Sequence, residues 1–98
     1  MMNVKFKYYE FKSVWVVYIG LNDYKNAEIH EGDIVKTNLD GIDYIGEIVY
    51  KAPSFCLKIR EENGECAHSY LEQWHDGVRI EVLGNVYENA EILNQKHI

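Results

Sequence analysis

The sequence predicts a mainly β domain in which short antiparallel strands curl into a small SH3-like barrel, with one or two short peripheral helices. Segments rich in β-branched and aromatic residues recur at close spacing, as they do in small barrels. Two-residue hairpin signals, Asp40-Gly41 and Asn63-Gly64, lie between such segments. The chain has 98 residues with 47% apolar content, which suits one domain with a single core.

The first 20 residues predict two adjacent strands that pack on the barrel. Residues 4–9 alternate between apolar and basic side chains, and residues 14–19 are dense in β-branched and aromatic ones. Gly20 is expected to end the second strand. A loop over residues 20–27 should follow, because Asn22, Asp23 and Asn26 are residues that favour turns or tolerate positive φ.

The barrel is expected to span about residues 28–87 of the single domain 1–98. Glu31-Gly32-Asp33 is a tight turn that starts its first strand, and Pro53 interrupts the chain between two later ones. The expected barrel strands cover residues 34–37, 44–50, 55–60 and 78–83.

Two short helices are expected outside the strands. Ser69 followed by Glu72 has the spacing of a capping box, which predicts a helical turn over residues 69–74. Asn89 is a suitable N-cap for a C-terminal helix over about residues 89–95.

The second hairpin signal predicts which residues of two strands share a face. A two-residue turn at Asn63-Gly64 pairs Glu61 with Cys66. Cys66 and His68 then face the core beside Leu57, whereas Cys56 lies on the opposite face. A disulfide between the two cysteines is therefore disfavoured, and Cys66 is interpreted as a small core residue.

The residue types of a metal or catalytic site are present without a supporting pattern. Cys56, Cys66, His68 and His75 lack the paired spacing of structural zinc sites. A nucleophile at Cys66 or Ser69 with a histidine base and Asp76 lacks a glycine-rich elbow. No metal, cofactor or catalytic residue is predicted.

The clustered carboxylates Glu28, Glu31 and Asp33 have two interpretations. They could support acid–base chemistry or bind Mg²⁺, but aspartate is also favoured in turns because it hydrogen-bonds the local backbone. A structural role for Asp33 is the preferred hypothesis.

The charge balance opposes general nucleic-acid binding. Ten Lys and Arg residues against sixteen Asp and Glu give a formal charge of −6. Lys5, Lys7 and Lys12 could form a local basic patch or simply a solvated strand face. A small barrel that binds nucleic acid through these lysines with Lys58 and Arg60 is the alternative hypothesis.

Aromatic residues are abundant, with eight tyrosines and two tryptophans. Such side chains dominate both cores and binding surfaces, so they either fill a thin barrel or form a contact surface. The residues predicted to form an interaction surface are Trp15, Tyr24, Lys58, Arg60 and Trp74.

No membrane segment is expected. The longest apolar run, residues 14–19, has about a third of the length that a membrane span requires. A cytoplasmic location with reduced cysteines is the working expectation.

Two blocks of the sequence resemble the YopX-like phage protein family. They run from Tyr18 to Val35 and from Val82 to Leu93, and they frame the central hairpins. The chain departs from the family pattern at Asn26, His30 and Ala90, where glycine, an aromatic residue and proline are usual. The signature residues are Gly20, Leu21, Asp23, Asn26, Glu31, Gly32, Asp33, Gly84, Asn85, Tyr87, Glu88 and Asn89.

The resemblance implies a phage or prophage origin, an all-β core with an SH3-like part, and self-association into a homo-oligomer. It carries over no catalytic residues. The chain is accordingly expected to be a non-enzymatic accessory protein of the bacterial host cytoplasm that binds a host or phage protein and could inhibit a host factor. An enzyme using Cys66, His68 and His75 is the distant alternative.

Overall fold

The structure is mainly β and contains eight strands in its described part. The computed structural model describes residues 6–9, 13–39, 41–52, 54–60, 66–70 and 79–94. The strands are β1 (Phe6–Tyr9), β2 (Val14–Asn22), β3 (Glu28–His30), β4 (Asp33–Leu39), β5 (Ile42–Lys51), β6 (Ser54–Arg60), β7 (Cys66–Tyr70) and β8 (Ile80–Asn85). A 3₁₀ helix, η3 (Ala90–Asn94), follows them.

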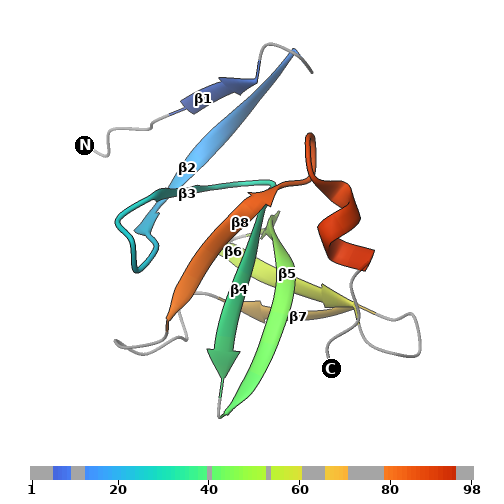
Figure 1. Ribbon diagram of the computed structural model, residues 1–98. Coiled ribbons are helices and arrows are strands. Elements are labelled where there is room, and N and C mark those ends of the chain that lie inside the picture. The colour runs from blue at the N-terminus through green and yellow to red at the C-terminus, as the bar shows by residue number, and fades with distance from the viewer. Residues whose placement is uncertain are drawn as a thin grey trace.

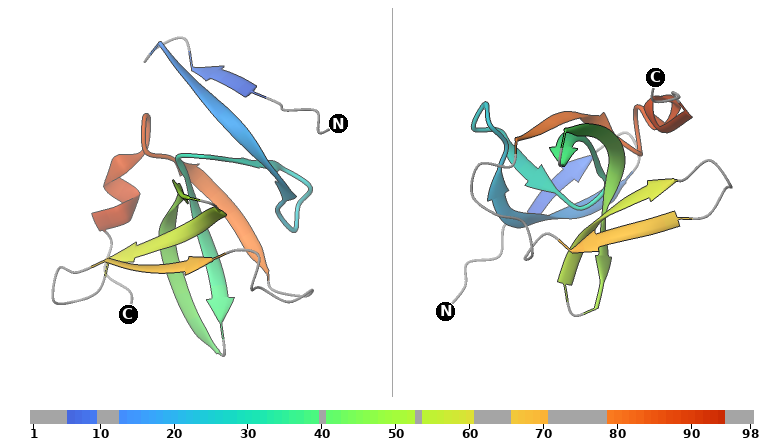
Figure 2. Two further views of the ribbon diagram at one scale, coloured as in Figure 1. Left: turned by 180° about the vertical axis from the view of Figure 1, so that it is seen from behind. Right: turned by 90° about the horizontal axis from the view of Figure 1, so that it is seen from below.

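The strands form two antiparallel sheets. The first has the order β1-β2-β3, and the second has the order β7-β6-β5-β4-β8. The hairpin of β1 and β2 extends beyond the second sheet, and η3 lies on the other side of β8 (Figure 1). Figure 2 shows the same arrangement from behind and from below, where the second sheet is strongly curved.

The SH3-like barrel predicted from the sequence is not confirmed. The second sheet ends in β7 on one side and β8 on the other, and no ladder joins these two edges among the strands that the structure describes. A barrel requires the first and last strands to pair. The sheet is therefore open in the described part, and β2 and β3 lie across it instead of closing it.

The core lies between the second sheet and the strands β2 and β3. Its buried side chains come from five strands: Ile29, Val35, Ile48, Leu57, Ile59 and Ile80. Ile19 of β2 packs against this cluster as well. Ile29 and Ile19 thus cover the inner face of the second sheet, which joins the two sheets through apolar burial.

The predicted turns at Gly32 and Gly41 are confirmed. Gly41 has a φ of 84° and Asp40-Gly41 connects Leu39 to Ile42, which pair directly across the β4–β5 hairpin. Gly32 has a φ of 89° immediately before β4. Only glycine takes such angles without steric cost, so the turn signals were specific.

The prediction that Gly20 ends β2 is wrong. Gly20 has a φ of 91°, but the strand continues to Asn22 across an irregularity in its pairing with β3. A positive-φ residue inside a strand is typical of a bulge, which bends the strand without ending it. The loop therefore begins at Asp23, and Asn26 turns it with a φ of 67° as predicted.

The predicted register of β6 and β7 is wrong by one residue. Cys66 pairs with Arg60, not with Glu61, because an odd number of residues joins the two strands. A one-residue shift moves each β7 position to the other face relative to β6, so position 66 shares a face with Cys56. The two positions are still four residues apart along β6, about 13 Å, which exceeds disulfide reach.

The predicted helical turn over residues 69–74 is wrong at its start, because Ser69 and Tyr70 belong to β7. The rest of that segment lies outside the described residues. The C-terminal helix is present over Ala90–Asn94, within the predicted range. No helix in the described ranges is long and apolar enough to cross a membrane.

Candidate functional site

Three exposed aromatic residues lie together on one face of the β1–β2 hairpin. Tyr8 pairs with Trp15 across the ladder, and Phe6 lies two residues along β1 on the same face. Phe6 is 59% exposed, Tyr8 42% and Trp15 67%. We call these three residues the aromatic face.

The three rings contact one another. The centroids of Tyr8 and Trp15 lie 4.7 Å apart, and the Phe6 ring meets Trp15 edge-on at 6.5 Å. Aromatic side chains are 150–250 Å² in size, so the face leaves roughly 300–400 Å² accessible. This is the size of the largest apolar patch on a typical monomer, which is often functional.

The opposite face of the hairpin holds it against the rest of the protein. Val16 is buried, and the Tyr9 ring packs on Tyr87 with a centroid distance of 5.7 Å. The ammonium group of Lys7 lies 4.8 Å from the centre of the Tyr9 ring. Because neighbouring residues of a strand point to opposite faces, fixing this side of the hairpin displays the aromatic face to solvent.

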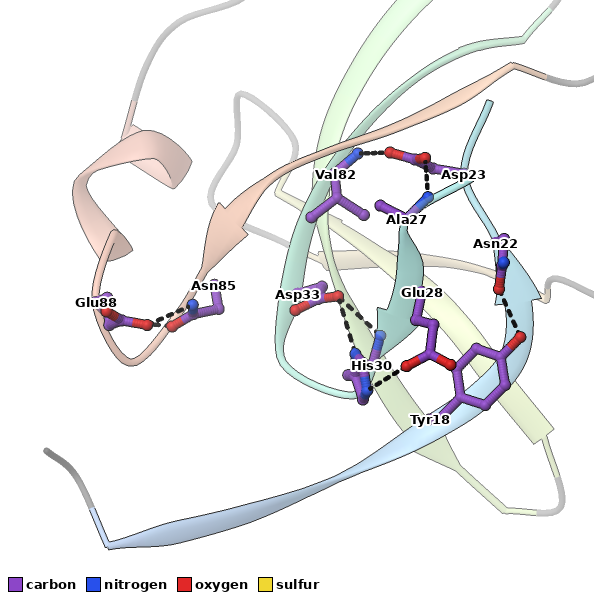
Figure 3. A network of polar contacts seen from close by, with 10 residues as sticks. All are labelled: Tyr18, Asn22, Asp23, Ala27, Glu28, His30, Asp33, Val82, Asn85 and Glu88. Carbon is purple, nitrogen blue, oxygen red and sulfur yellow. Dashed lines mark hydrogen bonds and ion pairs between the residues drawn. The ribbon is translucent and has the colours of Figure 1, made fainter. Parts of the chain in front are cut away.

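A buried polar pair, His30 and Asp33, lies where β3 leads into β4, beside β2 (Figure 3). The Asp33 carboxylate accepts a hydrogen bond of 2.8 Å from the backbone N–H of His30. The same carboxylate lies 3.9 Å from Nδ1 of His30, and Nε2 of His30 lies 3.8 Å from the carboxylate of Glu28. The Tyr18 ring packs beside the imidazole at 5.7 Å.

Burial shifts the pKa of both groups toward their neutral forms. It raises the pKa of Asp33 to about 6, although the His30 N–H and the Lys7 charge act in the opposite direction. Burial also lowers the pKa of His30, and the Lys7 charge adds to this effect while Glu28 opposes it. The pair holds the turn between β3 and β4 together and offers little surface to a substrate.

The turn at Gly32 connects this pair to three other segments. The Gly32 N–H donates to the carbonyl of Ile48 at 2.8 Å, and its carbonyl accepts from the N–H of Val86 at 2.9 Å. A Cβ atom at Gly32 would lie 2.8 Å from the Tyr87 ring. The neighbouring Glu31 donates its N–H to β2 at the carbonyl of Val17.

The C-terminal signature residues form a compact capped turn. The Asn85 side chain accepts from the N–H groups of Tyr87 at 3.0 Å and Glu88 at 2.9 Å, and it donates to the Glu88 carboxylate. The Asn89 side chain accepts from the N–H of Asn85 at 3.3 Å. Gly84 leaves room for Asn89, whose side chain would lie 2.6 Å from an added Cβ. Asn89 directly precedes η3, as predicted, and its carbonyl accepts from the N–H of Ile92 at 3.0 Å, while its side chain closes this turn.

Asp23 organises the loop between β2 and β3. Its carboxylate accepts from the backbone N–H groups of Lys25 at 2.9 Å, Ala27 at 2.8 Å and Val82 at 3.0 Å. Burial alone would raise the pKa of Asp23, but these hydrogen bonds lower it below its ordinary value. The bond to Val82 attaches the loop to β8 of the second sheet.

The residues predicted to form an interaction surface lie on different elements. Trp15 is near the start of β2, whereas Tyr24 follows the end of that strand, with Arg79 at 3.8 Å from its ring centre. Lys58 is on β6, where it pairs with the acidic Glu47 across the ladder. Trp74 and the side chain of Arg60 lie outside the described residues.

Phe6 and Tyr8 belong to the aromatic face but are not among the surface residues predicted from the sequence. Their alternation with Lys7 and Tyr9 was visible, but both sides of the strand carry an aromatic residue. The side that faces solvent therefore depends on packing against Tyr87, which lies far away in sequence.

The residues considered for metal binding or catalysis are only partly described. Cys56 is a buried free thiol whose pKa burial raises, so it is a poor nucleophile at neutral pH. Cys66 and His68 belong to β7 without described side chains, and His75 lies outside the described residues. No group of three potential ligands that could hold a metal ion occurs among the residues that the structure does describe.

Together these features define a small antiparallel β protein with a tightly hydrogen-bonded frame and an exposed aromatic hairpin. The family model described as YopX protein matches residues 2–94 of the chain. The chain therefore belongs to the YopX family. Neither a curated protein nor a solved structure matches it.

Proposed function

We propose that this protein is a non-enzymatic binding protein whose aromatic face contacts a protein partner. The observation that carries the proposal is the exposure of Phe6, Tyr8 and Trp15 on one face of the hairpin. Trp and Tyr are enriched at the energetic centres of protein interfaces, because they bury large area with little loss of conformational entropy.

Burial of the described side chains that could act as catalytic groups supports a non-enzymatic role. His30 and Asp33 are directed toward each other and toward local backbone, and Cys56 is covered. Catalytic groups need contact with a substrate. By contrast, the large rings of the aromatic face are exposed together, which suits binding.

Membership of the YopX family supports a phage or prophage accessory role in the cytoplasm of a bacterial host. The partner would then be a host or phage protein. In the sharper form of the proposal, the protein inhibits a host enzyme of nucleic acids, because its net charge of −6 could imitate phosphates.

Partner capture tests the proposal directly. The full chain is immobilised, exposed to host lysate at low salt, and the retained proteins are identified by mass spectrometry. Trp15→Ser and Phe6→Ser should abolish retention of a specific protein. Tyr50→Ser is the matched control, because Tyr50 is also exposed (54%) but belongs to β5.

Retention that is equal for the wild type and both hairpin variants would contradict the proposal. So would the release of nucleic acid alone from the captured material, which would instead support the hypothesis of nucleic-acid binding. Circular dichroism of each variant verifies that the fold is intact.

A further inference from the structure

The hairpin has a second binding feature beside its aromatic face. β1 forms the edge of the sheet β1-β2-β3, and in the described part of the chain no strand pairs with it on the side away from β2. Backbone N–H and C=O groups on that side are open to an incoming strand. Extended peptides commonly bind proteins by adding a strand to such an edge.

We infer that β1 binds an extended, acidic segment of a partner protein by strand addition. This inference rests on the proposed function, since it assigns a binding mode and a chemical class of partner to the same hairpin. The segment would alternate acidic and apolar residues.

Charge favours an acidic segment. The first 12 residues contain three of the ten basic residues and one of the sixteen acidic ones, a balance of +2, whereas the rest of the chain has seven against fifteen, a balance of −8. Lys7 is exposed in the middle of the edge strand. A carboxylate directly across from it on an added strand would form an opposite-charge pair.

The aromatic face is the reason to expect apolar residues at every second position of the partner segment. Phe6 and Tyr8 point to the face opposite that of Lys7, and Trp15 continues this face onto β2. Every second residue of an added strand would lie beside these rings. Aromatic rings paired with β-branched residues across strands are a favourable combination, so valine suits these positions.

The same lysine disfavours a second copy of this chain as the occupant. Antiparallel pairing of two β1 strands in the register that places Lys7 opposite Lys7 would bring the two ammonium groups close together. Like charges on adjacent strands are destabilising, and lysine on an edge strand commonly prevents such self-pairing.

Synthetic peptides test the inference with the full chain. The first peptide alternates Glu and Val, the second has the same composition in two separate blocks, and the third alternates Lys and Val. A fourth carries proline at a central position of the first. Binding is followed by anisotropy of a labelled peptide and by hydrogen exchange of the β1 amides.

Only the alternating Glu and Val peptide should bind, and it should slow exchange of the β1 amides that point away from β2. Lys7→Gln should weaken this binding by about fivefold, the value of a favourable cross-strand charge pair, and Lys7→Arg should preserve it. Lys36→Gln is the matched control, because Lys36 is also exposed but belongs to β4, which is paired on both sides by β5 and β8.

Equal binding of the block peptide or of the lysine peptide would overturn the inference. If none of the peptides bound, the inference of strand addition would also be overturned. If Trp15→Ser still abolished partner capture in that case, the proposed function would stand without strand addition. Self-association that is detected by sedimentation and abolished by Tyr8→Pro would show that a second copy occupies the edge, which would also overturn the inference.

Discussion

Asp33→Asn should make the protein more stable at neutral pH. Burial raises the folded-state pKa of Asp33 from 3.8 to about 6, so the folded protein binds this proton more tightly than the unfolded chain does. The stability that protonated Asp33 contributes is therefore fully present below about pH 4 and is lost as the pH rises through 6. Two pKa units correspond to about 3 kcal/mol.

The asparagine variant removes this ionisation but keeps an oxygen that can accept the hydrogen bond from His30. Its new amide group lacks an assigned partner, which costs about 1 kcal/mol or more. We expect a net gain of about 1–2 kcal/mol in the free energy of unfolding at pH 8, and a small loss at pH 4.5. Urea unfolding at pH 4.5, 6 and 8 measures both values.

Ionisation of His30 gives the free energy of unfolding the opposite pH dependence. Burial lowers its folded-state pKa, so its contribution is present above the unfolded value of 6.5 and is lost as the pH falls. The double variant with His30→Gln should therefore have the flattest pH profile. If Asp33→Asn instead lost the same stability at all three pH values, the Asp33 pKa would not differ between the folded and unfolded states, and the reasoning from burial would be refuted.

Three further predictions concern the frame and the hairpin. Gly46→Ala should cost more than about 2 kcal/mol in urea unfolding because its Cβ would lie 2.5 Å from the Lys58 carbonyl oxygen, whereas Gly41→Ala meets open space and should cost about 1 kcal/mol from its positive φ. Asp23→Ala removes three hydrogen bonds to backbone N–H groups and should cost about 2–4 kcal/mol, with a smaller loss as the pH falls below 3.8, because acid removes the stability that the lowered pKa of the folded carboxylate provides. Trp15→Ser should change the free energy of unfolding by less than about 1 kcal/mol while abolishing partner capture; a large loss would show that the ring is structural.

Local backbone chemistry explains which parts of the fold were predictable. The hairpin at Asp40-Gly41 and the turn at Gly32 followed from residues that tolerate positive φ, and both are present. The same signal at Gly20 was misread, because a positive φ can bend a strand as well as end one. Sequence cannot separate the two outcomes, since the choice depends on whether β3 pairs beyond the bend.

Features that depend on distant contacts were not predictable. Whether an even or an odd number of residues joins β6 to β7 decides which face of the sheet each β7 residue joins. The two-residue turn signal at Asn63-Gly64 predicted an even number, whereas the observed number is odd. Barrel closure likewise depends on whether edge strands pair, which no local pattern encodes. The exposure of Phe6 and Tyr8 depends on Tyr87 receiving the other side of the hairpin.

The residues that carry the family resemblance and the residues of the aromatic face have separate physical roles. Gly32, Asn85 and Asp23 make contacts within the frame, with backbone groups or with residues of the same turns. Trp15 and Phe6 contact neighbouring rings on the hairpin and otherwise face solvent. We therefore expect substitution on the aromatic face to leave the hydrogen bonds of the frame intact. The proposed binding function is therefore tested by substitutions on the hairpin, where a loss of binding can be separated from a loss of the frame.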